Sequence, residues 1–336
     1  MAEERKVALV LTGGGAKGAF QFAAEKYARE AMGYKWDVIA GVSVGALNGA
    51  MLAMGKYQEL DEIWNHTLMR ERIYTGDLGS WTLLGFALKQ LPGLLGLSPR
   101  LVESRAILGN GPLRRLIDRH FQRDRVTIDL RIGVVSLETG RYYVYKLVNG
   151  EVYERRDRGG HTGDYMYAHV DDATFKQIIL ASTTIPVVWA PQAIGMLGSA
   201  VDGGIRNINP IGDVLDTLQS PDDEVVVISC DPKEPPQTRT PQTGVQVAKR
   251  SLDLVLAEIV RTDIREFERI NFIVRQAEEK GVTIENERGD PFVSYKATVI
   301  QPDEPLDDAL DFSPDAIKRS MAKGRTAARQ VLGDPA

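Results

Sequence analysis

Two short apolar runs, each followed by a glycine turn, limit the possible folds of this chain more than any other feature of its sequence. Residues 7–11 form an uninterrupted apolar run that is followed, after Thr12, by glycines 13–15, and residues 38–40 are followed directly by Gly41. An apolar run without polar alternation is typical of a strand covered on both faces, as in a parallel sheet. Helix-forming residues follow each glycine turn, over residues 19–32 and 44–54. The chain therefore opens strand–turn–helix twice, which predicts a doubly wound α/β fold.

The rest of the sequence predicts further helices and strands. It contains no linker that would divide the chain into separate domains. We expect helices over residues 60–69, 112–121, 175–182 and 251–280 and from Ser313 onward, and strands over 131–137, 142–147, 225–229 and 295–300. The polar segment 153–172 is expected to be a surface loop, with Arg155-Arg156-Asp157-Arg158 solvated in it. We find no internal repeat, so one domain over residues 1–336 is the prediction.

Residues 81–97 form an apolar segment that Gly85, Pro92 and Gly93 interrupt, so one regular helix is excluded. They carry a single charge, and we expect a lid or interfacial contact within an insertion at about residues 70–112. Ordinary packing under a surface helix is the alternative. The flanking arginines would meet anionic head groups or simply solvent; they are Arg70, Arg72, Arg100, Arg105, Arg114 and Arg115.

Charge and cysteine content narrow the possible partners and the compartment. The net charge of −5 does not indicate a basic surface for nucleic acid. A single cysteine allows no intramolecular disulfide, which fits a reducing compartment, and Cys230 ends an apolar run that predicts a buried core position. With no signal peptide and no long apolar span, we expect a cytoplasmic protein that contacts membranes only peripherally. The oligomeric state is open.

The second glycine turn, Gly41-Val42-Ser43-Val44-Gly45, has the G-x-S-x-G pattern of a nucleophile elbow. Serine needs an adjacent base to become a nucleophile, and a tight strand-to-helix turn exposes its hydroxyl at a helix N-terminus. The pattern also occurs by chance, but here a predicted strand precedes it and a predicted helix follows. Ser43 is therefore a candidate nucleophile.

The first glycine turn, Gly13-Gly14-Gly15-Ala16-Lys17-Gly18, exposes consecutive backbone N–H groups at the start of a helix. Two such donors can stabilise the oxyanion of a tetrahedral intermediate. The alternative is a dinucleotide-binding loop, because the glycines also match G-x-G-x-x-G and Asp37 lies about 20 residues on. Asp37, however, precedes its strand instead of ending it, and Lys17-Gly18 reverses the order of a P-loop.

The base that would serve Ser43 is a histidine or an acid. The histidines are His66, His120, His161 and His169, and none follows position 169. A Ser–Asp–His order through Asp202 is therefore excluded, and the other familiar triads place serine last. Asp202-Gly203-Gly204 offers a carboxylate for a Ser–Asp dyad, although an Asp-Gly-Gly sequence alone is more typical of a tight turn.

Taken together, these motifs resemble the patatin-like phospholipases, or lipid acyl hydrolases, of bacterial type. The resemblance rests on four blocks in order, which are residues 13–18, 41–45, 181–186 and 202–204 with Asn209-Pro210 after them, and it extends to Phe312-Ser313-Pro314. It implies an α/β fold, a three-layer α/β/α sandwich with a mostly parallel central sheet. Thr12 departs from the acid of plant members and leaves the catalytic pair untouched.

The resemblance also implies roles for individual residues. Ser43 would be the nucleophile and Asp202 the general base. The oxyanion hole would be Gly13, Gly14 and Gly15, with the amides of Gly14 and Gly15 as donors and Gly13 supporting the turn. Lys17 and Gly18 would support the loop, and Gly41 and Gly45 would form the elbow.

The implied activity is two-step hydrolysis of a fatty-acyl ester through an acyl-serine, with no metal or cofactor. The expected partner is a lipid or ester substrate, with a membrane surface as a peripheral contact and no nucleic acid. Three alternatives remain: a histidine-dependent acyltransferase, a dinucleotide-binding protein, and a membrane-binding relative without catalysis.

Overall fold

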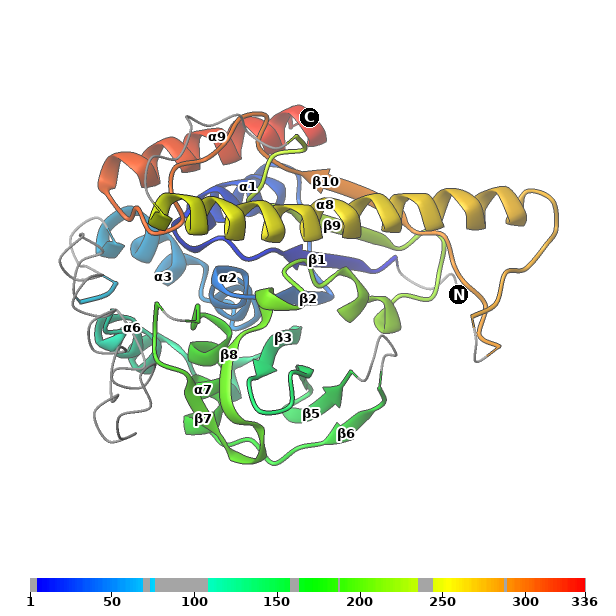
Figure 1. Cartoon of the computed structure of the whole chain (residues 1–336). Helices are drawn as coiled ribbons and strands as arrows, with labels where there is room; N and C mark the ends of the chain where they lie inside the picture. The colour runs from blue at the N-terminus through cyan, green and yellow to red at the C-terminus, as the bar shows by residue number, and fades with distance from the viewer. Residues whose placement is uncertain are drawn as a thin grey trace.

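A mixed sheet with the strand order β10-β9-β1-β2-β3-β4-β5-β6 lies at the centre of the molecule (Figure 1). The computed structural model describes residues 5–68, 73–75, 108–157, 163–186, 188–234, 244–286 and 289–335. The predicted lid at 81–97, and most of the insertion at about 70–112, lie outside these residues.

The strands of the described chain fall into a parallel and an antiparallel group. The parallel group is β1 (Val7–Leu11), β2 (Val38–Gly41), β3 (Asp129–Ser136), β9 (Glu224–Ile228) and β10 (Lys296–Ile300). The antiparallel group is β4 (Tyr142–Val148), β5 (Glu151–Arg156), β6 (Tyr165–Tyr167), β7 (Gln192–Ile194) and β8 (Gly198–Asp202). Parallel pairing thus ends at β3, where the predicted hairpin turns the chain back.

The helices surround this sheet. The longer ones are α1 (Gly18–Ala31), α2 (Val44–Ala53), α3 (Tyr57–Glu62), α6 (Gly111–His120), α7 (Asp172–Ser182), α8 (Gly244–Glu278) and α9 (Pro314–Leu332). Single turns of 3₁₀-helix are η1 (Gly15–Lys17), η4 (Arg123–Arg125), η5 (Gly195–Leu197), η6 (Gly203–Ile205), η7 (Ile211–Asp213) and η8 (Leu215–Thr217), and η2 (Ile63–Thr67) is a π-helical turn.

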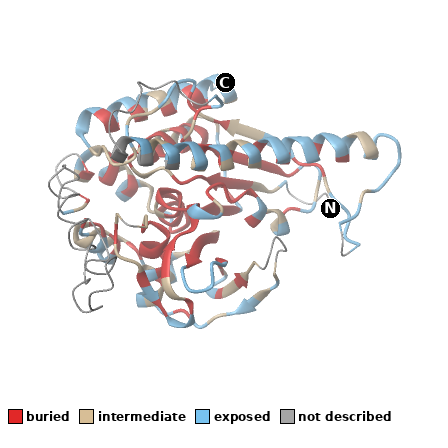
Figure 2. Cartoon of the chain, in the orientation of Figure 1, coloured by how far each residue is buried: buried red, intermediate tan, exposed pale blue. Residues whose placement is uncertain are grey.

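Alternate residues of the parallel strands face two separate cores. Leu9 and Leu11 of β1 point into a core with α1, α2, α7 and α9, whereas Ala8 and Val10 point into a core with α8. Buried strands therefore lie between two layers of helices whose outer faces are exposed (Figure 2). This arrangement confirms the predicted α/β/α sandwich, and the continuous apolar runs are explained because both faces of these strands are covered.

The prediction of a solvated surface loop over residues 153–172 is wrong in two respects. β5 extends to Arg156 and β6 occupies Tyr165–Tyr167, so much of this segment belongs to the sheet. Arg155, expected to be solvated, is only 4% exposed and forms an ion pair of 2.5 Å with the buried Asp213. Polar composition predicted a loop, but ion pairing allows these side chains to be buried.

Two other predictions concern helices. α8 begins at Gly244, earlier than the predicted residue 251, and its far end extends beyond the sheet (Figure 1). Ser313 accepts a hydrogen bond from the N–H of Ala316 and caps α9, which confirms the predicted helix start. Among the described helices, none has the combination of length and hydropathy needed to cross a bilayer.

Candidate active site

The edge of β3 determines where Ser43 and Asp202 meet. β4 occupies one edge of β3, so β2 and β8 share the other edge. Gly41, the last residue of β2, pairs with Ile132, and Asp202, the last residue of β8, pairs with Val134. Two residues along one strand thus separate the end of β2 from the end of β8. The elbow and the Asp-Gly-Gly turn therefore converge although about 160 residues separate them in the sequence.

Ser43 occupies a tight turn between β2 and α2. Its φ of 58° and ψ of −129° are rare for a residue with a side chain. A methyl group on Gly41 would lie 2.2 Å from the carbonyl oxygen of Gly45, and one on Gly45 would lie 2.2 Å from that of Leu11. Both positions therefore require glycine, which accounts for the G-x-S-x-G spacing. The conformation of the turn is that of a strained nucleophile elbow.

A buried hydroxyl holds the elbow against the sheet. The backbone N–H of Ser43 donates to Ser182 Oγ at 3.1 Å, and Ser182 Oγ donates in turn to the carbonyl oxygen of Gly133 at 2.8 Å. Ser182 is fully buried at the end of α7, in the third of the sequence blocks. This block therefore fixes the backbone of the candidate nucleophile and need not take part in the chemistry itself.

Asp202 is a buried carboxyl group, 5% exposed, with a strongly altered acidity. Burial raises the pKa of Asp202 to about 7, because the charged form loses solvation. A backbone hydrogen bond from Gly204, at 2.8 Å from Oδ1, and a side-chain hydrogen bond from Ser43 both lower the pKa, but by less than burial raises it. A carboxylate with a pKa near neutrality is far better suited to accept a proton than an exposed aspartate.

The glycine loop lies against both of these turns. The N–H of Gly13 donates to the carbonyl oxygen of Ile208 at 3.1 Å, and a methyl group on Gly13 would lie 3.3 Å from Ser43 Cβ. The N–H of Ala16 donates to the carbonyl oxygen of Ala309 at 2.7 Å. Between them, the N–H groups of Gly14 and Gly15 have no hydrogen-bond acceptor within the described chain. Two adjacent amides beside Ser43 are thus available to an oxyanion, whereas that of Gly13 is engaged in the turn.

Lys17 and Gly18 connect the loop to its surroundings. Lys17 Nζ forms an ion pair of 2.8 Å with Asp231, just after β9, and this carboxylate raises the pKa of Lys17 against the opposing effect of burial. A methyl group on Gly18 would lie 2.2 Å from Val44, so glycine permits the close approach of α1 and α2. These contacts are compatible with the loop-supporting roles that the resemblance implies for both residues, which stay a prediction.

A chain of buried amide groups joins the loop to the helices behind it. Gln21 Nε2 donates to the carbonyl oxygen of Thr12 at 2.6 Å, and Asn48 Nδ2 donates to Gln21 Oε1 at 3.3 Å. Trp64 Nε1 donates to Asn48 Oδ1 at 2.9 Å. Cys230, fully buried next to Gly14, is a core residue as predicted, and burial raises the pKa of its thiol to about 12. These contacts rigidify the loop from beneath.

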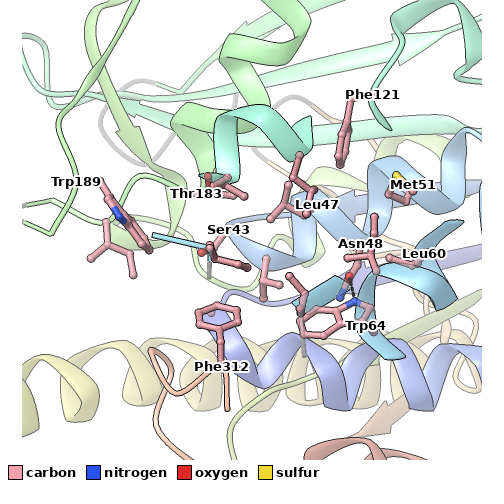
Figure 3. A pocket seen from close by; sticks show the side chains of 18 residues that line it. Ser43, Leu47, Asn48, Met51, Leu60, Trp64, Phe121, Thr183, Trp189 and Phe312 are labelled. Carbon is pink, nitrogen blue, oxygen red and sulfur yellow. Dashed lines mark hydrogen bonds between the residues drawn. The ribbon is translucent and has the colours of Figure 1, made fainter. Parts of the chain in front are cut away.

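An apolar cavity opens directly at Ser43 (Figure 3). Its wall is formed mainly by aliphatic and aromatic side chains from α2, α3, η2 and α6. Those labelled in Figure 3 on the α2 side of Ser43 are Leu47, Met51, Leu60, Trp64 and Phe121. A cavity of this composition accepts an alkyl chain and leaves a reacting ester at its serine end.

Two residues of the cavity wall, Phe312 and Trp189, were not predicted from the sequence to lie at the site. Phe312 lines the cavity from the segment before α9, and its ring contacts Tyr74 edge-on at 6.3 Å between centroids. Tyr74 also donates from its hydroxyl to the carbonyl oxygen of Leu310 at 3.0 Å. Trp189 lines the wall on the other side of Ser43 (Figure 3). The resemblance extends to Phe312-Ser313-Pro314 without giving Phe312 a place in a cavity, and the apolar character of Trp189 is shared by core residues.

The described histidines lie away from this cavity. His66 and His169 are exposed, and His120 is half-buried in α6, where burial lowers its pKa; none of the three lines the cavity. His161 lies outside the described residues. Asp37, the residue needed for dinucleotide binding, accepts the N–H of Val7 at the amino end of β2, the opposite end from the glycine loop. Within the described residues, no cluster of three or more metal-binding side chains occurs.

Comparison with known protein families identifies the family of this chain. The chain matches the family described as patatin-like phospholipase over residues 9–215, which include the glycine loop, the elbow and the Asp-Gly-Gly turn. The chain belongs to the patatin-like phospholipase family. It is accordingly a hydrolase acting on ester bonds, and its substrate is a lipid or ester. The segment that contributes Phe312 lies beyond the matched residues.

Comparison with solved structures yields distant similarity only. VipD from Legionella pneumophila has 14% sequence identity and a TM-score of 0.44, over 98% of this chain and 67% of VipD. The ExoU chain of the ExoU–SpcU complex, from the type III secretion system of Pseudomonas aeruginosa, has 16% identity and a TM-score of 0.29, over 78% of this chain and 51% of that one. No curated protein sequence matches this chain.

Proposed function

We propose that this phospholipase-family protein is a serine lipid acyl hydrolase with a Ser43–Asp202 dyad. The observation that carries the proposal is the buried carboxyl of Asp202, whose pKa of about 7 is set beside a serine in an elbow conformation. A base of this pKa is about half ionised at neutral pH and can accept a proton. No histidine is required in this mechanism.

In the first step, Asp202 accepts the hydroxyl proton of Ser43 as Oγ bonds to the carbonyl carbon of the ester. The carbonyl π electrons move to oxygen, and the amides of Gly14 and Gly15 donate to that oxyanion. The intermediate collapses as the bond to the alcohol oxygen breaks, and the alcohol takes the proton from Asp202. Removing one donor of an oxyanion hole typically costs about 3 kcal/mol of barrier, and here two unpaired donors are adjacent.

In the second step, Asp202 accepts a proton from water as the water oxygen bonds to the acyl carbon. The new intermediate expels Ser43 Oγ, which regains the proton, and the fatty acid leaves. The apolar cavity at Ser43 supports a fatty-acyl ester as substrate, because burial of each methylene contributes about 0.8 kcal/mol to binding. The substrate type we propose is therefore a phospholipid, lysophospholipid or simple carboxylic ester with an aliphatic acyl chain.

The test is fatty-acid release from p-nitrophenyl esters of short and long chains and from mixed phospholipid vesicles. Ser43→Ala and Asp202→Asn are expected to lower the turnover at least about 10³-fold, since each removes one member of a catalytic unit. His66→Ala, His120→Ala, His161→Ala and His169→Ala are expected to retain activity. These histidine variants are the matched controls.

A histidine-dependent acyltransferase is the runner-up, and the same variants separate it from the dyad. Loss of turnover in one histidine variant, or full activity in Asp202→Asn, would exclude the dyad and place the base elsewhere. If the wild-type protein releases no fatty acid from any of these substrates, the proposed activity is wrong. Folding of each variant is checked by circular dichroism.

A further inference from the structure

The indole N–H of Trp189 is a buried donor without a partner in the wall of the cavity. Trp189 is 5% exposed, and its Nε1 has no hydrogen-bond acceptor in the described structure. The side chain lines the same cavity as Ser43. Buried tryptophan N–H groups normally find an acceptor, because leaving such a donor unpaired costs about 1–3 kcal/mol. A ligand that supplies an acceptor would recover this interaction.

The other polar side chains of the cavity are already engaged. Trp64 Nε1 donates to Asn48 Oδ1, and Asn48 itself donates to Gly18 and Gln21. Thr183 Oγ1 donates to the carbonyl oxygen of Leu180 at 2.8 Å. Among the described residues that line the cavity, two side-chain donors are therefore left for a ligand. They are the Ser43 hydroxyl and the indole N–H of Trp189.

The position of Trp189 indicates which part of a substrate it meets. In Figure 3, Trp189 lies on one side of Ser43, while Leu60, Trp64 and Met51 lie on the other. The latter side is apolar and suits the acyl chain. An ester bound at Ser43 with its acyl chain there directs its alcohol portion toward Trp189. Trp189, whose N–H is unpaired, thus lies on the side of Ser43 that the alcohol portion would occupy.

We propose that Trp189 is a specificity-determining residue that donates a hydrogen bond to an oxygen of the substrate's alcohol portion. The favoured substrates are thus fatty-acyl esters of oxygen-bearing alcohols, such as glycerol or a glycerophosphate, over esters of plain alkanols. This inference rests on the proposed function, since it assumes that the ester reacts at Ser43. The acceptor is a hydroxyl or phosphate oxygen on the second or third carbon of the alcohol, counted from the ester oxygen.

The test compares two esters of one acyl chain. 1-Octanoylglycerol and pentyl octanoate share the acyl group and have alcohols of similar size, but only the first offers extra oxygens. Trp189→Phe keeps an aromatic ring and removes the N–H. We expect kcat/KM for 1-octanoylglycerol to fall about five- to tenfold relative to that for pentyl octanoate, the factor that one neutral hydrogen bond provides. Because the ratio is taken within one variant, losses in acyl-chain binding cancel.

Trp64→Phe is the matched control, since it removes an indole N–H that is bonded within the protein. It is expected to change kcat/KM for both esters by the same factor. Trp189→His retains a ring N–H and should keep the preference for 1-octanoylglycerol. This variant keeps the inference testable if Trp189→Phe folds poorly. Octanoyl glycerophosphate, as a third ester, distinguishes a phosphate acceptor from a hydroxyl.

An unchanged ratio in Trp189→Phe, or equal ratios in Trp189→Phe and Trp189→His, overturns the inference and leaves Trp189 a packing residue. Failure of the proposed function is a separate result, because it is read from Ser43→Ala. If Ser43→Ala hydrolyses both esters, the dyad is wrong whatever the ratio in the Trp189 variants. If Ser43→Ala is inactive and the ratio is unchanged, only the role of Trp189 is wrong.

Discussion

At the scale of single residues, the proposed dyad makes catalysis depend on pH through the buried carboxyl of Asp202. Burial raises the pKa of Asp202 to about 7, and only the ionised form can accept the Ser43 proton. We therefore expect kcat/KM to rise with pH along a limb of unit slope and to level off above a midpoint near 7. The measurement is a pH–rate profile from pH 5 to 9 with one soluble ester. A midpoint near 4, the value of an exposed aspartate, would contradict the assignment.

The same burial predicts that Asp202 destabilises the folded protein. The folded pKa lies above the unfolded value of 3.8, so the folded state binds more protons between these values and stability falls as pH rises from about 4 to 7. Asp202→Asn avoids the buried charge and should raise the free energy of unfolding at pH 8, by up to about 4 kcal/mol. Urea unfolding at pH 8 and at pH 5 checks this. The gain must shrink at pH 5; a gain independent of pH has another cause.

The backbone of Ser43 predicts a second stabilising change. Its φ of 58° and ψ of −129° are a conformation that glycine adopts without a steric penalty. Ser43→Gly and Ser43→Ala both remove the hydroxyl, but only glycine relieves the strain. We expect Ser43→Gly to be more stable than Ser43→Ala by about 1–3 kcal/mol. Equal melting temperatures of the two variants would show that the elbow is not strained.

At the scale of elements, the glycine loop depends on the segment before α9. Gly15 has φ +58°, and a methyl group on it would lie 2.2 Å from the carbonyl oxygen of Ala309. Gly15→Ala should therefore displace the loop and lower kcat by about 10²-fold or more, because one oxyanion donor is misplaced. Gly33→Ala is the control. It has φ +71° with no atom within 4 Å of the added methyl group, so it shares the backbone strain and lacks the steric clash.

A comparison of kcat and the melting temperature in these two variants separates the two effects. Both should lower stability, whereas only Gly15→Ala should lower kcat strongly. If Gly33→Ala reduces kcat as much as Gly15→Ala, the effect is global and not specific to the loop.

At the scale of the whole molecule, the packing of α9 on α1 brings the C-terminal segment to the site. A methyl group on Gly324 of α9 would lie 2.2 Å from the carbonyl oxygen of Phe20 in α1. Helix propensity favours Gly324→Ala by about 1 kcal/mol, but the contact is with backbone that cannot rotate away. We expect a net loss of about 1–3 kcal/mol in the free energy of unfolding.

Gly212→Ala is the control for this change, because it meets no atom within 4 Å and has no positive φ. It should leave stability within about 0.5 kcal/mol of wild type. Urea denaturation of both variants, followed by kcat measurements, tests whether loosening α9 also disturbs the loop that Ala309 contacts. A Gly324→Ala protein more stable than wild type would mean that the two helices can separate without cost.

The glycine turns and the resemblance to the family could be read from local sequence. Both glycine turns and the capped start of α9 could be predicted, because their geometry depends on residues next to one another. The buried strands could be predicted from their apolar runs, but β5 and β6 could not, since ion pairs bury polar side chains such as Arg155 without any apolar pattern.

The surroundings of Ser43, in contrast, depend on how distant segments pack. The order of β2 and β8 along one edge of β3 sets Asp202 beside the elbow, and burial there raises its pKa. Trp189 and Phe312 reach the cavity from distant segments; the family resemblance extends to Phe312-Ser313-Pro314 but gives Phe312 no place in a cavity, and the sequence around Trp189 does not distinguish it from a core residue. Solvation and the pairing of donors with acceptors depend on every group within a few ångströms. Local sequence could therefore single out the candidate reacting groups, whereas the acidity of Asp202 and the unpaired donors follow from the packing.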